Sequence, residues 1–184
     1  TAGFSVATFT TPSSGTSSFG HGLGVTPSFV IVRGKSGGNW LCEHTSTGTQ
    51  YIILNGSGAA TTDSTVFNSA PTSTIVNLGT GFANATYIAY CWAPVSGFSA
   101  FGSYTGNGSA DGPFVYTGFR PRFVLIKRTD ISGNGWMILD SARDSYNVAG
   151  DRLWPNLSSA ESASPELDFL SNGFKCRAND SDIN

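Results

Sequence analysis

The feature of this sequence that most restricts its fold is an internal repeat. The segment PSFVIVR, which begins at Pro27, returns as PRFVLIK at Pro121. GFSV at Gly3 likewise returns as GFSA at Gly97, so both pairs lie 94 positions apart. A spacing that is kept by two independent segments indicates duplication of a whole structural unit rather than of a short motif.

Two further matches follow in the same order along the chain. GGNW and GNGW, which end at Trp40 and Trp136, lie 96 positions apart, and NLGTGF and FLSNGF lie 92 apart. Small insertions and deletions between matched segments are expected in loops. The sequence therefore predicts two homologous domains, 1–96 and 97–184.

Each unit has the short apolar runs, separated by Gly, Ser, Asn and Pro, that are typical of antiparallel β-structure. No window keeps apolar residues at helical spacing over three turns, and only SSAESAS at 158–164 suggests a short helical turn. Strands are expected near 4–10, 17–22, 28–33, 39–44, 50–54, 64–68, 73–78 and 86–93 in the first unit. In the second they are expected near 98–104, 114–117, 122–128, 136–140, 151–154, 167–170 and 173–177. The predicted fold class is all-β, with two tandem antiparallel β-sandwiches of jelly-roll, lectin-like type.

The two units differ at their ends. The first closes with a strong strand, TYIAYCWAPVS, whereas the second reaches Asn184 without an equivalent. We therefore expect the second sandwich to lack its last strand, which exposes an edge and part of the core. Two explanations are open: truncation of a longer polypeptide, or a strand supplied by another chain.

The repeated run itself predicts a central strand in each unit. Phe123 to Ile126 and Phe29 to Val32 are apolar on both alternating faces, whereas a half-exposed strand would alternate. Lys127 and Arg128, which follow, are interpreted as a strand end that reaches solvent.

Charge is scarce in this chain and excludes some partners. Charged residues are 12% of the total, the net charge is −2 and the pI is about 5.5, so no basic field exists to attract nucleic acid. No run approaches the length of about 20 apolar residues that a membrane helix needs, so membrane insertion is not expected.

The three cysteines, Cys42, Cys91 and Cys176, form no CxxC pair. They are interpreted first as small buried apolar residues, with a Cys42–Cys91 bridge and a reactive thiol as alternatives.

The sequence offers little for catalysis. The two histidines, His21 and His44, lie in no metal-ligand spacing and are expected at turns or strand ends. The carboxylates are scattered, with no pair at i, i+2 inside a strand of the kind that glucanases use. DSDIN at 180–184 resembles the opening of a calcium loop but lacks the following Gly, so a solvated loop is the alternative. We therefore predict no enzyme activity, no catalytic or metal site and no cofactor.

The most distinctive segment is LDSARDSYNVAGDRLWPN at 139–156, which is longer and more charged than its counterpart in the first unit. Planar polar groups beside aromatic rings are suited to a sugar, which needs a stacking face and hydroxyl partners. The candidate ligand-binding residues are Arg143, Asp144, Tyr146, Arg152 and Trp154. The alternative is that an arginine pairs with a local aspartate and fixes the loop, with Trp154 in the core.

The segments HGLGVTPSFVIVRGKSGGNW, YIAYCWAPVSGFSAFGSYTGNGSADGPFVYTGFRPRFVLIKR and the stretch from WMILDSARDSYN to LDFLSNGFKCRAND resemble a domain family of unknown function. That family recurs in tail and other virion-associated proteins of tailed bacteriophages. The resemblance covers essentially the whole chain, and GSYTGNGSADGPFVYTGFRP is its most specific part. It implies a concanavalin/laminin-G-like sandwich and a virion role, and it favours truncation, because relatives continue into a further strand. It brings no catalytic residues.

These expectations lead to one principal function hypothesis and one alternative. The principal hypothesis is a non-enzymatic structural or receptor-binding module of a phage virion, in a tail fibre or adhesin that contacts host glycan. The alternative is a capsid decoration or assembly protein without a ligand. Either one implies other virion proteins as partners, a homo-oligomer, and localisation in the virion.

Overall fold

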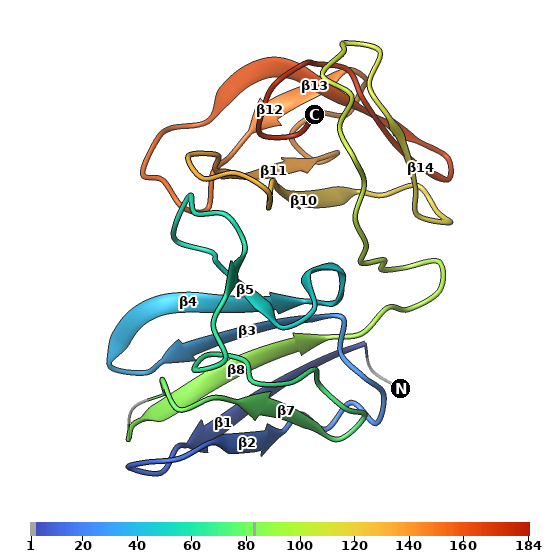
Figure 1. Cartoon of the computed structure of the whole chain (residues 1–184). Coiled ribbons are helices and arrows are strands. Elements are labelled where there is room, and N and C mark those ends of the chain that lie inside the picture. Colours follow the sequence, from blue (N-terminus) through green and yellow to red (C-terminus); the bar gives the residue numbers. More distant parts are fainter. Residues whose placement is uncertain (1–2, 83) are drawn as a thin grey trace. The chain divides into compact units, whose positions relative to one another are not determined.

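The computed structural model describes residues 3–82 and 84–184 and is all-β, with a single 3-10 turn, η1 (Thr45–Thr47), in the described ranges (Figure 1). The chain divides into two compact units. The first comprises Thr1–Leu54 and Ala60–Val95, and the second comprises Asn55–Ala59 and Ser96–Asn184.

The first unit contains a six-stranded antiparallel sheet in the order β1-β8-β3-β4-β5-β6, together with a separate β2·β7 pair. The large sheet is formed by β1 (Phe4–Thr10), β8 (Thr86–Trp92), β3 (Phe29–Gly34), β4 (Gly37–His44), β5 (Gln50–Ile53) and β6 (Thr61–Thr62). The pair is formed by β2 (Ser17–Gly20) and β7 (Ile75–Leu78). The two layers of this sandwich are seen in Figure 1.

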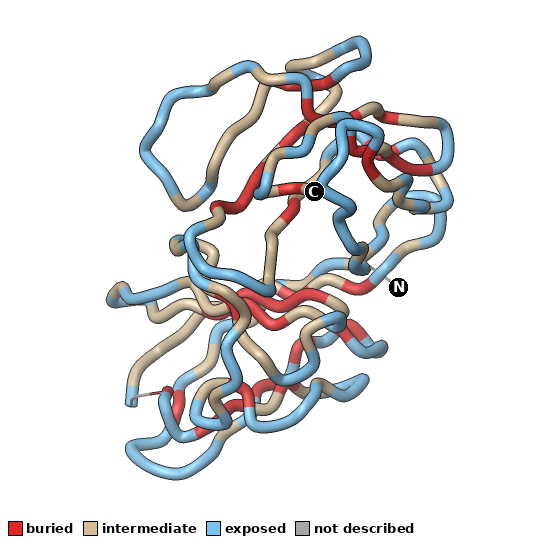
Figure 2. The backbone as a smooth tube through the Cα atoms, turned by 45° about the horizontal axis from the view of Figure 1, so that its top comes forward, coloured by how far each residue is buried: buried red, intermediate tan, exposed pale blue. Residues whose placement is uncertain are grey.

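The core of the first unit lies between these two layers. Val30 and Val32 of β3 and Ala89 of β8 pack in one cluster with Phe19 of β2 and Val76 of β7. The first four residues of β3 are buried on both faces (Figure 2), and β8 and β4 pair with its two edges. The prediction of a central strand is therefore confirmed for the first copy.

The second unit contains a four-stranded antiparallel sheet in the order β12-β13-β14-β9 and a β10·β11 hairpin. Its strands are β9 (Phe114–Tyr116), β10 (Phe123–Lys127), β11 (Trp136–Asp140), β12 (Ala149–Arg152), β13 (Ser162–Leu170) and β14 (Gly173–Cys176). Ile126 and Leu139 of the hairpin pack with Leu167 of β13 and Phe174 of β14 in a second core cluster.

The duplication is visible in the hydrogen bonds. Phe29 of β3 lies opposite His44, and Phe123 of β10 lies opposite Asp140. Just before each strand the same bond forms: Thr45 N donates to Ser28 O at 2.9 Å, and Ser141 N donates to Arg122 O at 2.9 Å. The two hairpins therefore share one register.

The end of each repeat aligns differently from the sequence match. β7 pairs with β2 and β14 pairs with β9, so the strand pairing makes β14, which contains Phe174, the counterpart of β7. The match between NLGTGF and FLSNGF, which equated Phe82 with Phe174, is therefore wrong: Phe82 lies in the turn after β7. In both segments a phenylalanine follows a glycine, but Phe82 lies beyond the end of its strand, whereas Phe174 lies inside β14.

Three predictions of secondary structure or strand position in the second unit are also wrong. Residues 98–104 form no strand, and 158–164 contain no helical turn, because β13 already begins at Ser162. β10 is not central, since it pairs only with β11 among the described residues, and Phe123 is 56% exposed. In the first unit, 64–68 is a turn instead of a strand.

Candidate functional site

The loop between β11 and β12 carries three of the candidate binding residues, Arg143, Asp144 and Tyr146, and its arginine is fixed by ion pairs. Arg143 Nε lies 2.8 Å from Asp140 Oδ2, and one terminal guanidinium nitrogen lies 2.8 Å from Glu161 Oε2. The other donates to the carbonyl of Ile138 at 3.3 Å. Arg143 therefore holds the start of this loop against its own hairpin.

Asp144 closes the other end of the same loop. Its Oδ2 accepts hydrogen bonds from the main-chain N–H groups of Gly150 at 2.7 Å and Asp151 at 2.6 Å. A carboxylate that accepts two N–H groups satisfies donors that would otherwise be unpaired where the chain enters β12. Arg143 and Asp144 thus act on the loop's conformation.

Arg152 and Trp154 come together at a buried carboxylate. A terminal nitrogen of Arg152 lies 2.5 Å from Glu166 Oε1 and 2.9 Å from Asp180 Oδ2, and the guanidinium carbon lies 5.1 Å from the Trp154 ring centroid. Glu166 is fully buried, and burial, followed by the nearby Asp180, raises its pKa despite Arg152. This group combines an ion pair with a cation–π contact and joins β12, β13 and the segment after β14.

Tyr146 is the candidate that the structure leaves exposed. Its side chain is 87% exposed, the highest value among the large exposed apolar and aromatic residues. The five candidates thus divide into a pair at Glu166, two residues that fix the loop, and one residue that the fixed loop presents to solvent.

The DSDIN segment uses its carboxylates for hydrogen bonds within the second unit. Asp180 Oδ2 is occupied by Arg152, and Asp180 Oδ1 accepts from Asp182 N at 2.9 Å. Asp182 Oδ1 accepts from the Asn134 amide at 2.9 Å and from Gly135 N at 3.2 Å. Within 3–82 and 84–184, no group of three or more His, Cys, Asp or Glu is placed to hold a metal ion.

Both histidines lie at strand ends, as the prediction of turns or strand ends allowed: His21 directly follows β2, and His44 is the last residue of β4. His21 is 2% exposed; its Nε2 lies 3.1 Å from Thr72 O, and its Nδ1 accepts from Leu23 N at 3.2 Å. His44 caps η1 by accepting from Ser46 N at 3.1 Å, and burial lowers its pKa.

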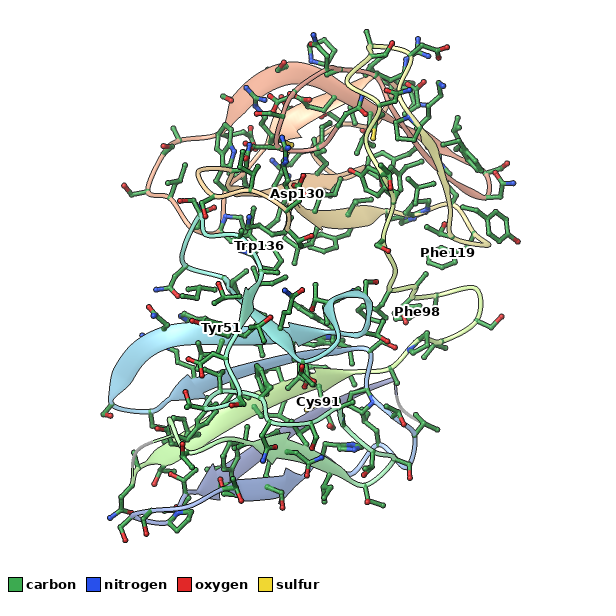
Figure 3. All side chains as sticks on the ribbon, in the orientation of Figure 1. Tyr51, Cys91, Phe98, Phe119, Asp130 and Trp136 are labelled. Atoms are coloured by element: carbon green, nitrogen blue, oxygen red, sulfur yellow. The ribbon has the colours of Figure 1, made fainter. Side chains whose placement is uncertain are left out.

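The cysteines are free thiols, which confirms the first interpretation over a Cys42–Cys91 bridge. All three are buried, and Cys91 lies in the core of the first unit (Figure 3). Burial raises the pKa of both Cys42 and Cys91 to about 12.

Sequence reasoning missed Glu43 as a candidate. It is 3% exposed on β4, and neither carboxyl oxygen has a hydrogen-bond partner in the structure. Burial raises its pKa to about 8. Glu43 lines a cavity of about 90 Å³ together with the hydroxyl residues Thr26, Ser28 and Thr45. The available signal was the repeat, because the corresponding position in β11 is Leu139, which is fully buried.

A larger hollow of about 310 Å³ also lies in the first unit. Gly37 and Gly38 of the β3–β4 turn line one part of it, and Phe82 and Tyr87 line another. Glycine main chain and two aromatic rings thus form parts of its lining.

The fold defines a tandem β-sandwich protein, in whose second unit Arg143, Asp144 and Asp182 make hydrogen bonds that hold loops in place. The chain belongs to the family described as a domain of unknown function, DUF7483, which matches residues 1–184. No curated protein and no solved structure matches it. In the described part of the chain, no helix is both long and apolar enough to span a membrane.

Proposed function

We propose that the protein is a non-enzymatic binding module of a bacteriophage virion, part of a tail fibre or adhesin, that contacts host-surface glycan through the loop after β11. The resemblance of its sequence to virion-associated proteins supports the setting. The loop geometry supports the mode of contact.

The observation that carries the proposal is the exposed ring of Tyr146 on a loop that is fixed at both ends. Before Tyr146, Arg143 is paired with Asp140 and Glu161. Asp144 ties this end of the loop to the other, because it accepts from the two main-chain N–H groups of residues 150 and 151, which follow Tyr146. A loop held in one conformation loses little entropy on binding, and an exposed aromatic ring offers a stacking face to a sugar. Tyr146 is therefore proposed as the principal contact, with Arg143 and Asp144 holding its loop in place.

A glycan array probed with the purified chain tests this function. We expect reproducible binding to at least one host-surface glycan and a loss of roughly tenfold or more in Tyr146→Ala, because an aromatic anchor carries much of the binding energy of such a contact. Tyr146→Phe keeps the ring and is expected to retain most of the affinity.

Tyr116→Ala is the matched control, since Tyr116 is also an exposed tyrosine, at 70%, on β9 of the same unit. Its binding is expected to equal that of the unchanged chain. Absence of any reproducible glycan, or an equal loss in both alanine variants, would refute the proposal.

The alternative function, capsid decoration or assembly, has its own observation. Phe123 is 56% exposed on a strand that has one edge unpaired among the described residues, as an element that joins another subunit would be. Electron microscopy of the intact particle separates the two functions, since density on the capsid lattice rather than the tail favours assembly.

A further inference from the structure

The second unit has an unpaired strand edge at the position where the first unit has β8. In the first unit, β8 lies between β1 and β3 and pairs antiparallel with both. The counterpart of β3 is β10, which pairs only with β11 among the residues described, and the counterpart of β1, residues 98–104, forms no strand. In the part of the chain that the structure describes, no strand therefore lies between these two segments of the second unit.

The main chain of β10 is oriented to accept such a strand. Because Arg122 O accepts from Ser141 N, the alternation of an antiparallel ladder directs the main-chain groups of Val124 and Ile126 toward β11. Those of Phe123 and Leu125 are directed away from β11. In β3 the matching residues, Phe29 and Ile31, pair with Trp92 and Tyr90 of β8.

The aromatic side chains also differ between the two units in the way that a missing strand would produce. Trp92 lies between two phenylalanines in the first unit, with ring centroids 5.0 Å from Phe4 and 5.4 Å from Phe29. Phe29 is 8% exposed, whereas its counterpart Phe123 is 56% exposed. Phe98, the counterpart of Phe4, is 78% exposed (Figure 3). Two phenylalanines of the second unit are thus without the aromatic partner that their counterparts share.

We propose that the free edge of β10 is a strand-acceptor site whose occupant is an uncharged extended polypeptide with the residue pattern of β8. The occupant pairs antiparallel with β10 in the register that β8 uses on β3. It directs small residues toward the core, at the positions of Ala89 and Cys91, which are fully buried in β8. It carries an aromatic residue, at the position of Trp92, that contacts Phe98 and Phe123. Main-chain bonds supply affinity in this mode of recognition, and side chains at alternate positions supply specificity.

The test uses the 184-residue chain and a fluorescent peptide of residues 86–93, TYIAYCWA, with Cys91→Ala and added terminal lysines for solubility. We expect saturable binding by fluorescence anisotropy and a higher Tm of the second unit in the presence of peptide. A peptide of the same composition in scrambled order is expected not to bind. Trp92→Ala in the peptide is expected to weaken binding by roughly tenfold, because it removes the aromatic anchor.

Two substitutions at one position of β10 separate main-chain pairing from side-chain contact. Leu125→Pro removes the N–H that faces the free edge but no bond to β11, and it is expected to weaken peptide binding at least about tenfold. Leu125→Ala keeps that N–H and is expected to retain most of the affinity. Circular dichroism and the melting of the second unit show whether both variants are folded.

The proposal is overturned if the β8 peptide shows no saturable binding, or if it binds Leu125→Pro as tightly as the unchanged chain. It is also overturned if the chain self-associates through β10, which light scattering detects as a dimer that Leu125→Pro abolishes. In that case the occupant is β10 of a second copy.

Discussion

At the scale of single residues, Glu43 is a carboxyl group in an environment that disfavours its charged form. A carboxyl that is 3% exposed without a hydrogen-bond partner is more stable protonated than charged. Its pKa is therefore raised, from 4.5 to about 8, and folding is linked to proton uptake. The stabilisation from this group is complete below pH 4.5 and is lost as the pH rises through 8.

We expect Glu43→Gln to remove this pH dependence. In the unchanged chain, the free energy of unfolding falls between pH 5 and pH 8 by an amount on the order of 4 kcal/mol from Glu43 alone. Because Gln does not titrate, the difference in unfolding free energy between variant and unchanged chain should shift in favour of the variant across this range. Urea denaturation of both proteins at several pH values measures this difference in unfolding free energy.

Glu43→Leu gives this position the residue type found at Leu139 and serves as a second non-titrating control. Both variants should show the same flattened profile. A slope in Glu43→Gln equal to that of the unchanged chain would contradict the raised pKa.

At the scale of elements, β3 and β10 have nearly the same sequence but different surroundings, and proline can reveal the difference. Ile31 pairs with Tyr90 of β8, whereas Leu125 faces the unpaired edge of β10. We expect Ile31→Pro to destabilise the first unit by about 3 kcal/mol or more, since it breaks a ladder bond inside a sheet. Leu125→Pro should cost about 1 kcal/mol, because an edge strand tolerates proline.

Chemical denaturation of both variants, followed by near-ultraviolet circular dichroism, makes this comparison. Ile31→Ala and Leu125→Ala correct each value for the lost side chain. Equal costs of the two prolines, after this correction, would show that the second edge is occupied.

The sequence predicted strands well where local pattern and partners agree. The run Phe29 to Val32, apolar on both faces, was assigned as a central strand, and the structure pairs both of its edges. The same reasoning failed for β10 and for residues 98–104, since an apolar run specifies what a strand can bury but not whether a neighbour is present to pair with it.

The candidate site was predictable only in part. The position and composition of the loop with Arg143 and Tyr146 could be found from the excess of charge relative to the first unit. Which arginine would pair with which acid could not, because Glu161 and Glu166 are distant in sequence and approach only after β12 and β13 are paired. Glu43 was missed because a single acidic residue in an apolar run is normally interpreted as lying at a strand end, where its side chain faces water.

At the scale of the whole molecule, each of the two units has its own core cluster. We therefore expect a substitution in one core to lower the stability of that unit. Leu78 in the first cluster and Leu167 in the second are both fully buried. Leu78→Ala and Leu167→Ala are each expected to cost about 2–5 kcal/mol, from lost burial and the cavity that remains. Each cost should fall on the unit that carries the substitution.

Hydrogen–deuterium exchange measured by mass spectrometry assigns the effect to a unit. Amides of β3 and β8 should exchange faster in Leu78→Ala, and amides of β13 and β14 should exchange faster in Leu167→Ala. Similar acceleration in both units from either substitution would mean that the two cores unfold together.

The burial of all three thiols has a practical consequence for labelling this chain. Thiolates are the species that react with maleimides, and the protons of Cys42 and Cys91 are held to a pKa of about 12. A cysteine introduced at an exposed position, such as Ser13→Cys, would therefore be labelled selectively in the folded chain without removal of any native residue. A gold cluster attached there would mark the chain directly in electron micrographs.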